Sequence, residues 1–455
     1  MSAQSMDQLV SLCKRRGFIF QSADIYGGMK GLYDYGPMGI ELKDNIKKAW
    51  WSSMIYERDD IEGLEASLIS HSIIWKYSGH EETFSDPLVD CKDCKSRMRQ
   101  DKMADQTKCD KCGSTNITEP RDFNLLFPLN VGPVVDDGSK AYLRAETAQG
   151  SYLNFKNVLD STSRKLPFGI AQVGKSFRNE IMARNFIFRT REFEQMEMQY
   201  FIKPGENDKY FKEWKETRYQ WWLDQGIKEE NIKWHKHDEN ELIFYANQAS
   251  DIEYRFPHGF DELEGVHDRT DYDLGSHTKN QADFDIQAKV KVNTHSNTKL
   301  NYLDQVTNES YIPFVVETAA GLGRAMIAIM NEAYEEEDLG DGKTRTVMKF
   351  KKHLAPIKVA IIPLKKNNEK IMEKCSEIKK SLLKLGIGRV SLENTGNIGK
   401  AYRRQDEVGT PICITVDFET LEETPASVTI RDRDTMEQHR VNVADLETYV
   451  RNFFL

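Results

Sequence analysis

The 455-residue sequence contains no apolar run near the ~20 residues that a helix needs to cross a bilayer, so we expect no membrane association. The N-terminal segment, MSAQSMDQLVSLCKRRGF, lacks the basic-then-apolar order of a secretion signal. Cysteine is scarce and odd in number, with seven residues. Without a secretion signal, such a set favours reduced thiols and a cytoplasmic location over a disulfide framework.

An excess of positive charge is absent as well. The formal net charge is −9, so no overall positive field attracts nucleic acid, and any contact with RNA must come from local patches. The sequence shows neither an internal repeat nor a low-complexity segment, which disfavours repeat architectures. At ~150 residues per domain, the length favours two to four domains.

The most specific spacing in the sequence is a pair of Cys-x-x-Cys motifs, Cys91–Cys94 and Cys109–Cys112, separated by fourteen residues. This spacing fits a tetrahedral Cys₄ zinc ribbon, because thiolates are soft ligands that select zinc in a reducing compartment. A disulfide pair and a redox-active dithiol are the alternatives, and a reducing compartment disfavours both. A Cys₄ site is closed, so its role would be structural. Four basic residues nearby could contact phosphates or form a solvated face: Arg97, Arg99, Lys102 and Lys108.

The segment at 167–201, PFGIAQVGKSFRNEIMARNFIFRTREFEQMEMQYF, predicts two extended strands joined by a basic loop. Residues two apart share a face of a strand, so we expect Arg178 and Glu180 together on the first strand. On the second, Phe193, Gln195 and Glu197 would line one face. An aromatic ring and a carboxylate beside an Arg–Glu pair suit a nucleotide and a small cation. The alternative is an ordinary antiparallel hairpin with one solvent-exposed, charged face.

Two later segments carry acidic and glycine-rich patterns. The segment at 313–330 predicts an apolar strand, a glycine turn and an apolar helix with Arg324 in its first turn. A helix N-terminus beside an arginine binds phosphate well, although glycine turns before helices are common. Within 245–277, an acidic cluster with His267 inside it and His277 just beyond favours a carboxylate-rich pocket that could bind magnesium, against a solvated acidic loop; its members are Glu262, Glu264, Asp268, Asp271 and Asp273.

After a polar stretch at 339–352, the pattern changes to alternating strands and helices. We expect strands at 359–364, 414–416 and 428–430 and helices at 367–385 and 443–453, which together predict a compact α/β domain. A basic, aromatic-bearing helix start at 396–406 suits single-stranded RNA, or is simply a solvated helix terminus. Nearer the N-terminus, apolar periodicity predicts helices at 6–16, 40–56, 147–158 and 204–226.

Phe177-Arg178-Asn179-Glu180, a variable loop and then Arg189-Thr190-Arg191-Glu192-Phe193 resemble motif 2 of the class II aminoacyl-tRNA synthetases. Gly321-Leu322-Gly323-Arg324 before an apolar helix resembles motif 3, and the region from Gly31 to Pro37 with its helix resembles motif 1. The phrases GLYDYGPMG, LRAETAQG, FRNEI, TREFEQME and ELEG…DRTDYDL are together similar to those of the homodimeric glycyl-tRNA synthetases, over nearly the whole chain.

The resemblance implies a fold. An α+β catalytic domain of the class II synthetase type, built on an antiparallel sheet, would span 1–345. It would carry a Cys₄ zinc-binding, ribbon-like insertion at 88–116 and a helical insertion at 203–240. A C-terminal α/β anticodon-binding domain would follow at 354–455. The resemblance further implies a cytoplasmic homodimer, joined through the motif 1 region, with tRNA(Gly) as its RNA partner.

The resemblance also implies a reaction. The carboxylate of glycine would attack the α-phosphate of ATP, with Mg²⁺ present, to give glycyl-adenylate and pyrophosphate; the 3′-terminal adenosine of tRNA would then take the glycyl group. No protein nucleophile is needed, so catalysis would rest on positioning and charge stabilisation, chiefly by Arg178, Glu180 and Arg324. The implied ATP site comprises Arg178, Asn179, Glu180, Phe188, Arg189, Phe193, Glu262, Leu263, Gly321, Gly323 and Arg324. The implied glycine site comprises Arg99, Glu146, Phe193, Gln195, Glu197, Glu317 and Ala319.

In detail, Arg178 would hold the α-phosphate and the glycine carboxylate, because its planar guanidinium offers bidentate geometry. Phe193 would stack under adenine and Arg324 over it, with Arg324 also reaching the γ-phosphate. Arg189 would bind the outer phosphates, and Glu262 would help to hold magnesium or ATP. Three glutamates would surround the glycine ammonium: Glu146, Glu197 and Glu317.

One departure from the family pattern concerns glycine selectivity. The family usually has Glu-Pro-Ser before the motif 3 glycine, whereas this chain has Glu317-Thr318-Ala319. The serine hydroxyl helps to define the small pocket. Thr318 would point to the other face of an extended segment, because neighbouring side chains alternate.

Two other functions compete with the ligase hypothesis. A catalytically inactive, synthetase-like nucleic-acid-binding accessory protein would lose the motif 2 and motif 3 arginines, but Arg178, Arg189 and Arg324 are all present. A synthetase for threonine or proline would lack the phrases GLYDYGP and REFEQME, which this chain contains.

Overall fold

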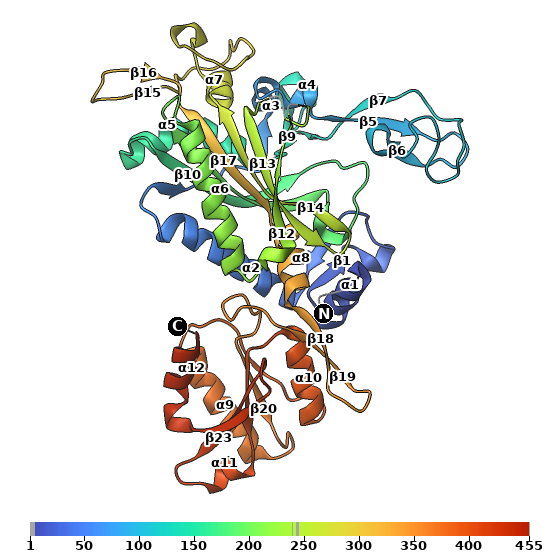
Figure 1. Ribbon diagram of the computed structural model, residues 1–455, viewed down its shortest axis with the longest axis vertical. Coiled ribbons are helices and arrows are strands. Elements are labelled where there is room, and N and C mark those ends of the chain that lie inside the picture. Colours follow the sequence, from blue (N-terminus) through green and yellow to red (C-terminus); the bar gives the residue numbers. More distant parts are fainter. Residues whose placement is uncertain (1–4, 239, 243–244, 455) are drawn as a thin grey trace.

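The computed structural model describes residues 5–238, 240–242 and 245–454. Its larger part is built on a seven-stranded sheet in the order β12-β13-β14-β17-β11-β10-β3 (Figure 1). Neighbouring strands are antiparallel except β10 and β3, which confirms the antiparallel sheet expected from the sequence. The strands are Ile61–Gly63 (β3), Phe168–Phe177 (β10), Glu192–Ile202 (β11), Ile232–Lys236 (β12), Gln248–Phe256 (β13), Gly259–Thr270 (β14) and Phe314–Gly321 (β17).

Helices cover the two faces of this sheet unequally. On one face, α2 (Pro37–Trp51), α6 (Asn207–Asp224) and α8 (Leu322–Ala333) share a core with Met196 and Met198 of β11. On the other, α5 (Ala148–Thr162) and α7 (Tyr272–His277) cover only one end. There Phe155 packs against Phe168 and Phe201, with ring centroids 5.9 and 4.7 Å apart. The rest of this second face lines a pocket.

Local sequence signals account for the first two helices. Helix α1 (Met6–Arg16) begins with a capping box between Ser5 and Gln8 and ends at Gly17, whose φ of 72° is left-handed, so the predicted limits are confirmed. Helix α2 begins at Pro37, three residues before the predicted start, because proline fits the first helical position without losing a hydrogen bond. Residues Ser52–Tyr56 continue it as a π-helical turn.

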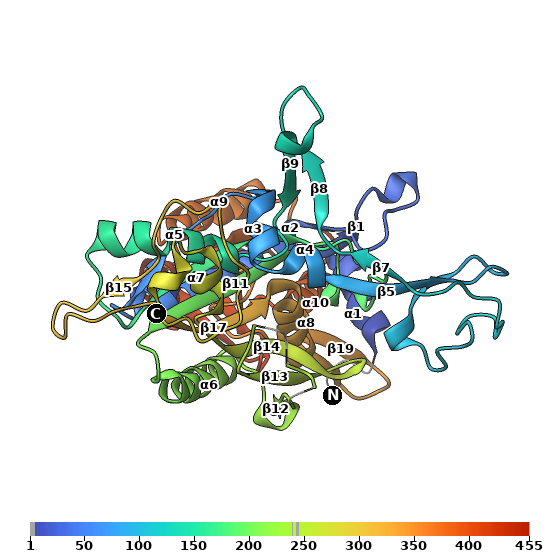
Figure 2. The same ribbon diagram turned by 90° about the horizontal axis from the view of Figure 1, so that it is seen from above.

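Two small sheets extend outward from the large one. The four cysteines lie on an arm formed by β5 (Ser85–Asp90), β6 (Arg97–Arg99) and β7 (Arg121–Asn124), which projects from the body in both views (Figures 1 and 2). The second sheet contains β4 (Ile69–His71), β9 (Lys140–Leu143) and β8 (Phe127–Asn130); Figure 2 shows the β8–β9 hairpin standing away from the body. Short helices α3 (Ser72–Tyr77) and α4 (His80–Thr83) join these sheets.

Three two-stranded ribbons complete the larger part: β1 (Ile19–Gln21) with β2 (Tyr33–Tyr35), β15 (Tyr302–Leu303) with β16 (Ser310–Tyr311), and β18 (Tyr334–Asp338) with β19 (Thr344–Met348). Strand β18 follows α8 directly, and β19 packs on the C-terminal part of the chain. Residues 349–358 then form neither helix nor strand. The predicted domain limits at 345 and 354 fall close to this segment and stay predictions.

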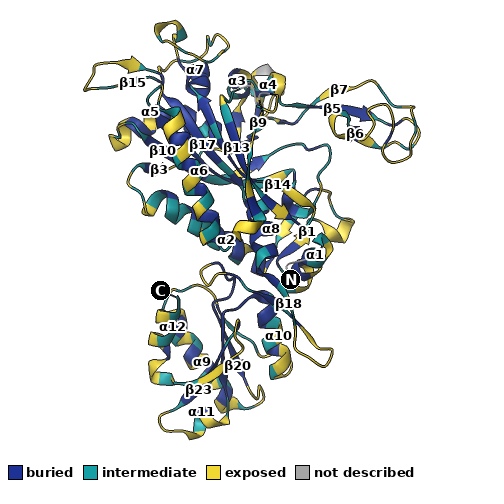
Figure 3. Cartoon of the chain, viewed as in Figure 1, coloured by how far each residue is buried: buried dark blue, intermediate teal, exposed yellow. Residues whose placement is uncertain are grey.

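The C-terminal part is an α/β unit, as the sequence predicts. Its sheet runs β21-β20-β22-β23-β24, parallel for the first three strands and antiparallel for the last two. The central strands of both large sheets are buried (Figure 3). Short strands β21 and β24 and helix α11 carry too little periodicity to be predicted. The elements are β20 (Val359–Pro363), α9 (Glu369–Leu383), β21 (Val390–Leu392), α10 (Ile398–Val408), β22 (Ile412–Val416), α11 (Phe418–Glu422), β23 (Ser427–Asp432), β24 (Gln438–Asn442) and α12 (Leu446–Phe454).

Candidate active site

The open face of the large sheet forms the floor of a pocket with a volume of about 380 Å³. Phe193, Gln195 and Glu197 of β11 all face it, so the predicted alternation along this strand is confirmed. The antiparallel register places Glu197 opposite Ala319 of β17 and Gln195 opposite Gly321. Strands β13 and β14 add Asp251, Glu262 and His267 to the lining.

Arg178 stands at one end of the pocket. Its guanidinium lies over the rings of Phe84 and Phe193, at 5.2 and 5.3 Å from their centroids, and its Nε donates to the carbonyl of Ala145 at 3.1 Å. Arg178 and Glu180 both line the pocket, but the prediction that they share a strand face is wrong. Strand β10 ends at Phe177, and the chain leaves the sheet there.

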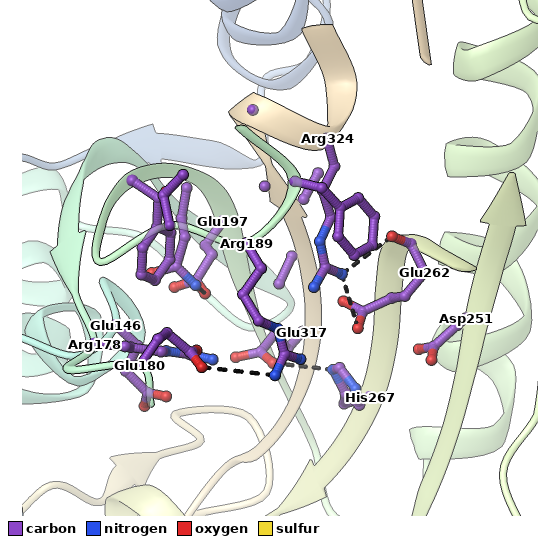
Figure 4. A pocket seen from close by; sticks show the side chains of 18 of the residues that line it. Glu146, Arg178, Glu180, Arg189, Glu197, Asp251, Glu262, His267, Glu317 and Arg324 are labelled. Atoms are coloured by element: carbon purple, nitrogen blue, oxygen red, sulfur yellow. Dashed lines mark hydrogen bonds and ion pairs between the residues drawn. The ribbon is translucent and has the colours of Figure 1, made fainter. Parts of the chain in front are cut away.

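Two further arginines face the same space (Figure 4). Arg189 approaches Glu180 at 3.6 Å. Arg324, in the first turn of α8, lies 4.4 Å over the ring of Phe188 and pairs with the Glu262 carboxylate at 2.9 Å. The predicted strand, glycine turn and helix around Arg324 are confirmed. Gly323 permits close packing here, because a Cβ at this position would lie 2.4 Å from the carbonyl oxygen of Ile187.

Two of the pocket glutamates are buried and lie beside basic side chains. Glu146, between β9 and α5, lies 3.2 Å from the Nε2 of His80. Burial alone would raise the pKa of Glu146, but His80 and Arg269 lower it below its usual range. Glu317 on β17 accepts from Arg269 at 2.9 Å and lies 3.0 Å from the Nδ1 of His267. Despite its burial, these cations lower the pKa of Glu317.

Glu197 differs from the other two glutamates. Its carboxylate accepts hydrogen bonds from the hydroxyl of Thr147 and, at 2.5 Å, from the amide of Gln195. Burial and the negative charges of Glu317 and Glu146 raise the pKa of Glu197 to about 8. The pocket therefore holds carboxyl groups with opposite protonation preferences.

The five acidic residues at 262–273 do not form one pocket, contrary to the prediction. Of these, Glu262 alone lines the pocket. Glu264 is fully buried on the opposite face, where it accepts from Arg218 of α6 at 2.7 Å. A register shift between Ile252 and Glu253 places an extra residue, Leu263, in β14. Such a bulge reverses the alternation of side chains, so residues 262 and 264 face opposite sides.

The three aspartates of the group have separate structural partners. Asp268 accepts from Asn207 and Asn247, Asp271 from the backbone N–H groups of residues 287 and 288, and Asp273 from Arg269. Leu263 belongs to the hydrophobic core and is not among the residues that line the pocket, and its contact with the nucleotide stays a prediction.

Two other predicted site residues lie outside the pocket lining. Asn179 uses its backbone N–H to bond the carbonyl of Leu125 at 2.8 Å. Arg99, on β6 of the projecting arm, pairs with Asp86 and Asp101 at 2.9 and 2.7 Å. All the other predicted ATP and glycine residues line the pocket: Glu146, Arg178, Glu180, Phe188, Arg189, Phe193, Gln195, Glu197, Glu262, Glu317, Ala319, Gly321, Gly323 and Arg324.

Sequence reasoning missed several residues that shape the pocket. The pocket is also lined by His80, Phe84, Asp251 and His267. Arg269 lies behind this lining and donates to Glu317. No local pattern marks these residues, because they come from elements far apart in the sequence. The one available signal was the pair of histidines near the acidic residues, of which His267 faces the pocket.

The difference from the family pattern at residues 318–319 lies in the floor of the pocket. Ala319 faces the pocket and lies opposite Glu197 on one side and Gly265 on the other. Thr318 is fully buried on the other face, as alternation predicts, and its hydroxyl has no hydrogen-bond partner among the described residues. Thr318 therefore cannot supply a hydroxyl to the pocket.

The cysteine arm brings its four thiols together. One ligand atom from each of Cys91, Cys94, Cys109 and Cys112 lies within 4.8 Å of the others, and none of the cysteines is in a disulfide. Within the described part of the chain, this is the one group of three or more metal-ligating residues gathered so closely. The donor set fits zinc, because four thiolates in a tetrahedral arrangement are characteristic of structural zinc sites.

The predicted RNA-facing helix start at 396–406 corresponds to α10. Lys400 and Arg403 are exposed, while Arg404 pairs with Glu393 at 2.8 Å and Tyr402 bonds Thr415 at 2.6 Å. A cavity of about 270 Å³ lies beside the N-terminus of α10, at the carboxyl end of β20. Within the described residues, no helix combines the length and apolar character that a membrane span requires.

Comparisons with known proteins match both parts of the chain. Residues 133–333 match the family model "tRNA synthetase class II core domain (G, H, P, S and T)", and residues 358–453 match "Anticodon binding domain". The chain is 49% identical to the glycine–tRNA ligase of Thermus thermophilus, over 99% of each chain. It is 47% identical to those of Deinococcus radiodurans and Treponema denticola, over 99% of this chain and 99% and 98% of the relatives.

Proposed function

The chain belongs to the glycine–tRNA ligase family, and from that premise we propose that it activates glycine with ATP and transfers the glycyl group to tRNA(Gly). The pocket carries this proposal, because three arginines and three buried glutamates line the same space. Glycine offers only an ammonium and a carboxylate to recognise. A site that binds glycine beside ATP needs cationic groups for the carboxylate and the phosphates, and anionic groups for the ammonium.

The arginines would bind the phosphates. Arg178, whose guanidinium lies near the rings of Phe84 and Phe193, would contact the α-phosphate and the glycine carboxylate, with Glu180 beside it. It would stabilise the charge that develops during adenylate formation. Arg189 would hold the outer phosphates. Arg324 would stack over adenine, with Phe193 below the ring, and reach the γ-phosphate. Catalysis would come from positioning these groups, because no protein nucleophile is required.

The glutamates would surround the ammonium of glycine. Glu146, Glu197 and Glu317 all line the pocket and are each at most 6% exposed. Exclusion of alanine would depend on close walls, since a pocket cannot gain affinity from an absent methyl group. With Ala319 in place of serine, the side chains of the pocket floor, including the Glu197 carboxyl group, would provide this steric exclusion.

Magnesium would be held mainly by the phosphates of ATP. This ion keeps near-octahedral oxygen coordination and commonly takes only one or two protein carboxylates beside substrate phosphates. Glu262 fits that requirement, because it lines the pocket next to Arg324. When bound, the ion would neutralise phosphate charge.

The remaining parts would bind RNA and a second subunit. We propose that the C-terminal unit binds the anticodon, which the matched family model supports. We also propose a cytoplasmic homodimer joined through the motif 1 region. Its support is an exposed apolar group directly before that region: Ile25, Tyr26 and Met29.

Pyrophosphate exchange tests the activity and the specificity together. The purified chain is expected to exchange pyrophosphate into ATP with glycine and not with alanine or serine. Exchange with none of the three would contradict the enzyme proposal, and faster exchange with serine would contradict the substrate. Light scattering after gel filtration tests the dimer separately.

A further inference from the structure

The three glutamates that line the pocket differ in their bonding partners. Arg269 and His267 bind Glu317, and His80 binds Glu146. Glu197 accepts only from a hydroxyl and an amide, both neutral. Among the described residues, Glu197 therefore takes part in no ion pair, although it is only 4% exposed.

The nearby cations have other partners. Arg144 donates to the backbone carbonyls of Ala66 and Lys175, both at 2.8 Å. Arg269 is shared between Glu317 and Asp273, at 2.9 and 2.7 Å. The charged groups that act on Glu197 from the packed elements are Glu146 and Arg144 before α5, Glu317 on β17 and Arg269 on β14. His80 on α4 and His267 on β14 lie against Glu146 and Glu317.

A buried carboxyl in this setting favours its neutral form. Its burial removes hydration, and two neighbouring carboxylates repel a further negative charge. The pKa of Glu197, raised to about 8, agrees with this geometry. A substrate ammonium that enters the pocket would make the ionised form of Glu197 the favoured one, because it would place a cation beside a carboxyl group that has no ion-pair partner.

We propose that Glu197 carries a proton in the free enzyme and releases it to solvent when the ammonium group of glycine binds. The carboxylate and the ammonium then form an ion pair, and the loss of the proton offsets the positive charge that the ammonium brings, so the net charge around the three glutamates stays the same. This inference rests on the proposed function, since it requires that glycine enters with its ammonium toward the glutamates.

Linkage fixes the direction of the pH dependence. Below the pKa of Glu197, each glycine that binds must displace a proton, so the apparent affinity for glycine rises about tenfold per pH unit and levels off above pH ~8. About one proton should leave per glycine bound at pH 6.5, and the number should fall as the pH rises. A pocket with an ionised Glu197 would show neither effect.

Titration calorimetry of the full chain with glycine, in the presence of α,β-methylene ATP, measures this release. The heat is compared at pH 6.5 in phosphate and in imidazole buffers, whose different ionisation enthalpies report the protons exchanged. We expect about one proton for the wild type and about none for Glu197→Gln. His267→Gln serves as the control for the neighbouring titratable group. The bond to Glu317 raises the pKa of His267 against the effect of its burial, and the release should persist without this histidine.

Each outcome decides the proposal. Glycine binding without buffer-dependent heat, or a release that persists in Glu197→Gln, would overturn it. If that variant is unfolded or binds too weakly, the wild-type affinity between pH 6 and 7.5 decides, and a flat profile would overturn the inference. Absence of both glycine binding and glycine-dependent pyrophosphate exchange would instead contradict the proposed function.

Discussion

At the scale of single residues, Arg178 shows how a side chain is fixed before it meets a substrate. Its guanidinium lies near two aromatic rings, and one backbone carbonyl accepts from its Nε. A side chain restrained in this way loses little freedom on binding phosphate. Lysine carries the same charge on a flexible stem without the planar fork.

Arg178→Lys is therefore expected to fold normally and to lose adenylate formation by about 100-fold or more, the range seen when a group aimed at developing charge is removed. Glycine-dependent pyrophosphate exchange measures the loss, and thermal unfolding checks the fold. Activity within about tenfold of the wild type would show that the proposed role of Arg178 is wrong.

Glu262 and Glu264 provide a second contrast, because two residues of the same type have different tasks. Glu264 neutralises the buried Arg218 and accepts from the indole of Trp222 at 2.6 Å. Removal of one partner of a buried ion pair commonly costs about 3–5 kcal/mol, because the other charge is left uncompensated.

We expect Glu264→Gln to lower the free energy of unfolding by about 3 kcal/mol or more. Glu262→Gln should leave stability nearly unchanged and raise the KM for ATP. Urea unfolding and pyrophosphate exchange, run on both variants, separate the two effects. Equal stability of the two variants would contradict the structural role of Glu264.

At the scale of elements, the cysteine arm is stabilised mainly by its own contacts. Its small core consists of Val89, Met98 and Met103 with two of the cysteines, and it is separate from the core of the large sheet. So small a core rarely suffices for a fold, and a structural metal commonly completes it.

A strong chelator is expected to release about one zinc per chain and to make residues 85–124 sensitive to protease, because folding of the arm is coupled to its metal. Elemental analysis and limited proteolysis measure these effects. Cys112→Ser should reproduce them, whereas Cys413→Ser, in the C-terminal sheet, should retain the metal. Purified protein without zinc would refute the ribbon.

At the scale of the whole molecule, buried charges connect the two parts of the chain. Arg345 of the β18–β19 ribbon donates to Asp406 of α10 at 2.8 Å, and Arg431 donates to the same carboxylate at 2.8 and 3.1 Å. Arg15 and Arg16 of α1 pair with the adjacent Glu407. These contacts fix α10, and with it the C-terminal unit, relative to the pocket-bearing sheet.

Asp406→Asn is expected to weaken this connection, because two buried guanidinium groups would lose their common counter-charge. Since the pocket lies away from this contact, pyrophosphate exchange should stay within about twofold of the wild type. The KM for tRNA in glycylation should rise about tenfold or more, because only the positioning of the RNA is lost. Glu377→Gln, on the exposed side of α9, is the matched control and should change neither. Equal losses in both reactions would contradict the assignment.

The sequence by itself determined the features that depend on local pattern. The cysteine spacing specified the thiol cluster, the period-two alternation placed Phe193, Gln195 and Glu197 on one face, and the strand–glycine–helix order placed Arg324 at a helix start. These signals are encoded within a few residues, so chain neighbours suffice to read them.

Tertiary structure alone decided which charged residues act together. One extra residue in β14 turns Glu264 and Leu263 away from the pocket, and no local pattern marks such a bulge. The partners of the glutamates, His80 and Arg269, come from distant segments that only the packed sheet and helices bring together. Burial and long-range contact set the charge of a carboxyl group, so the difference between Glu197 and its neighbours is a property of the folded molecule.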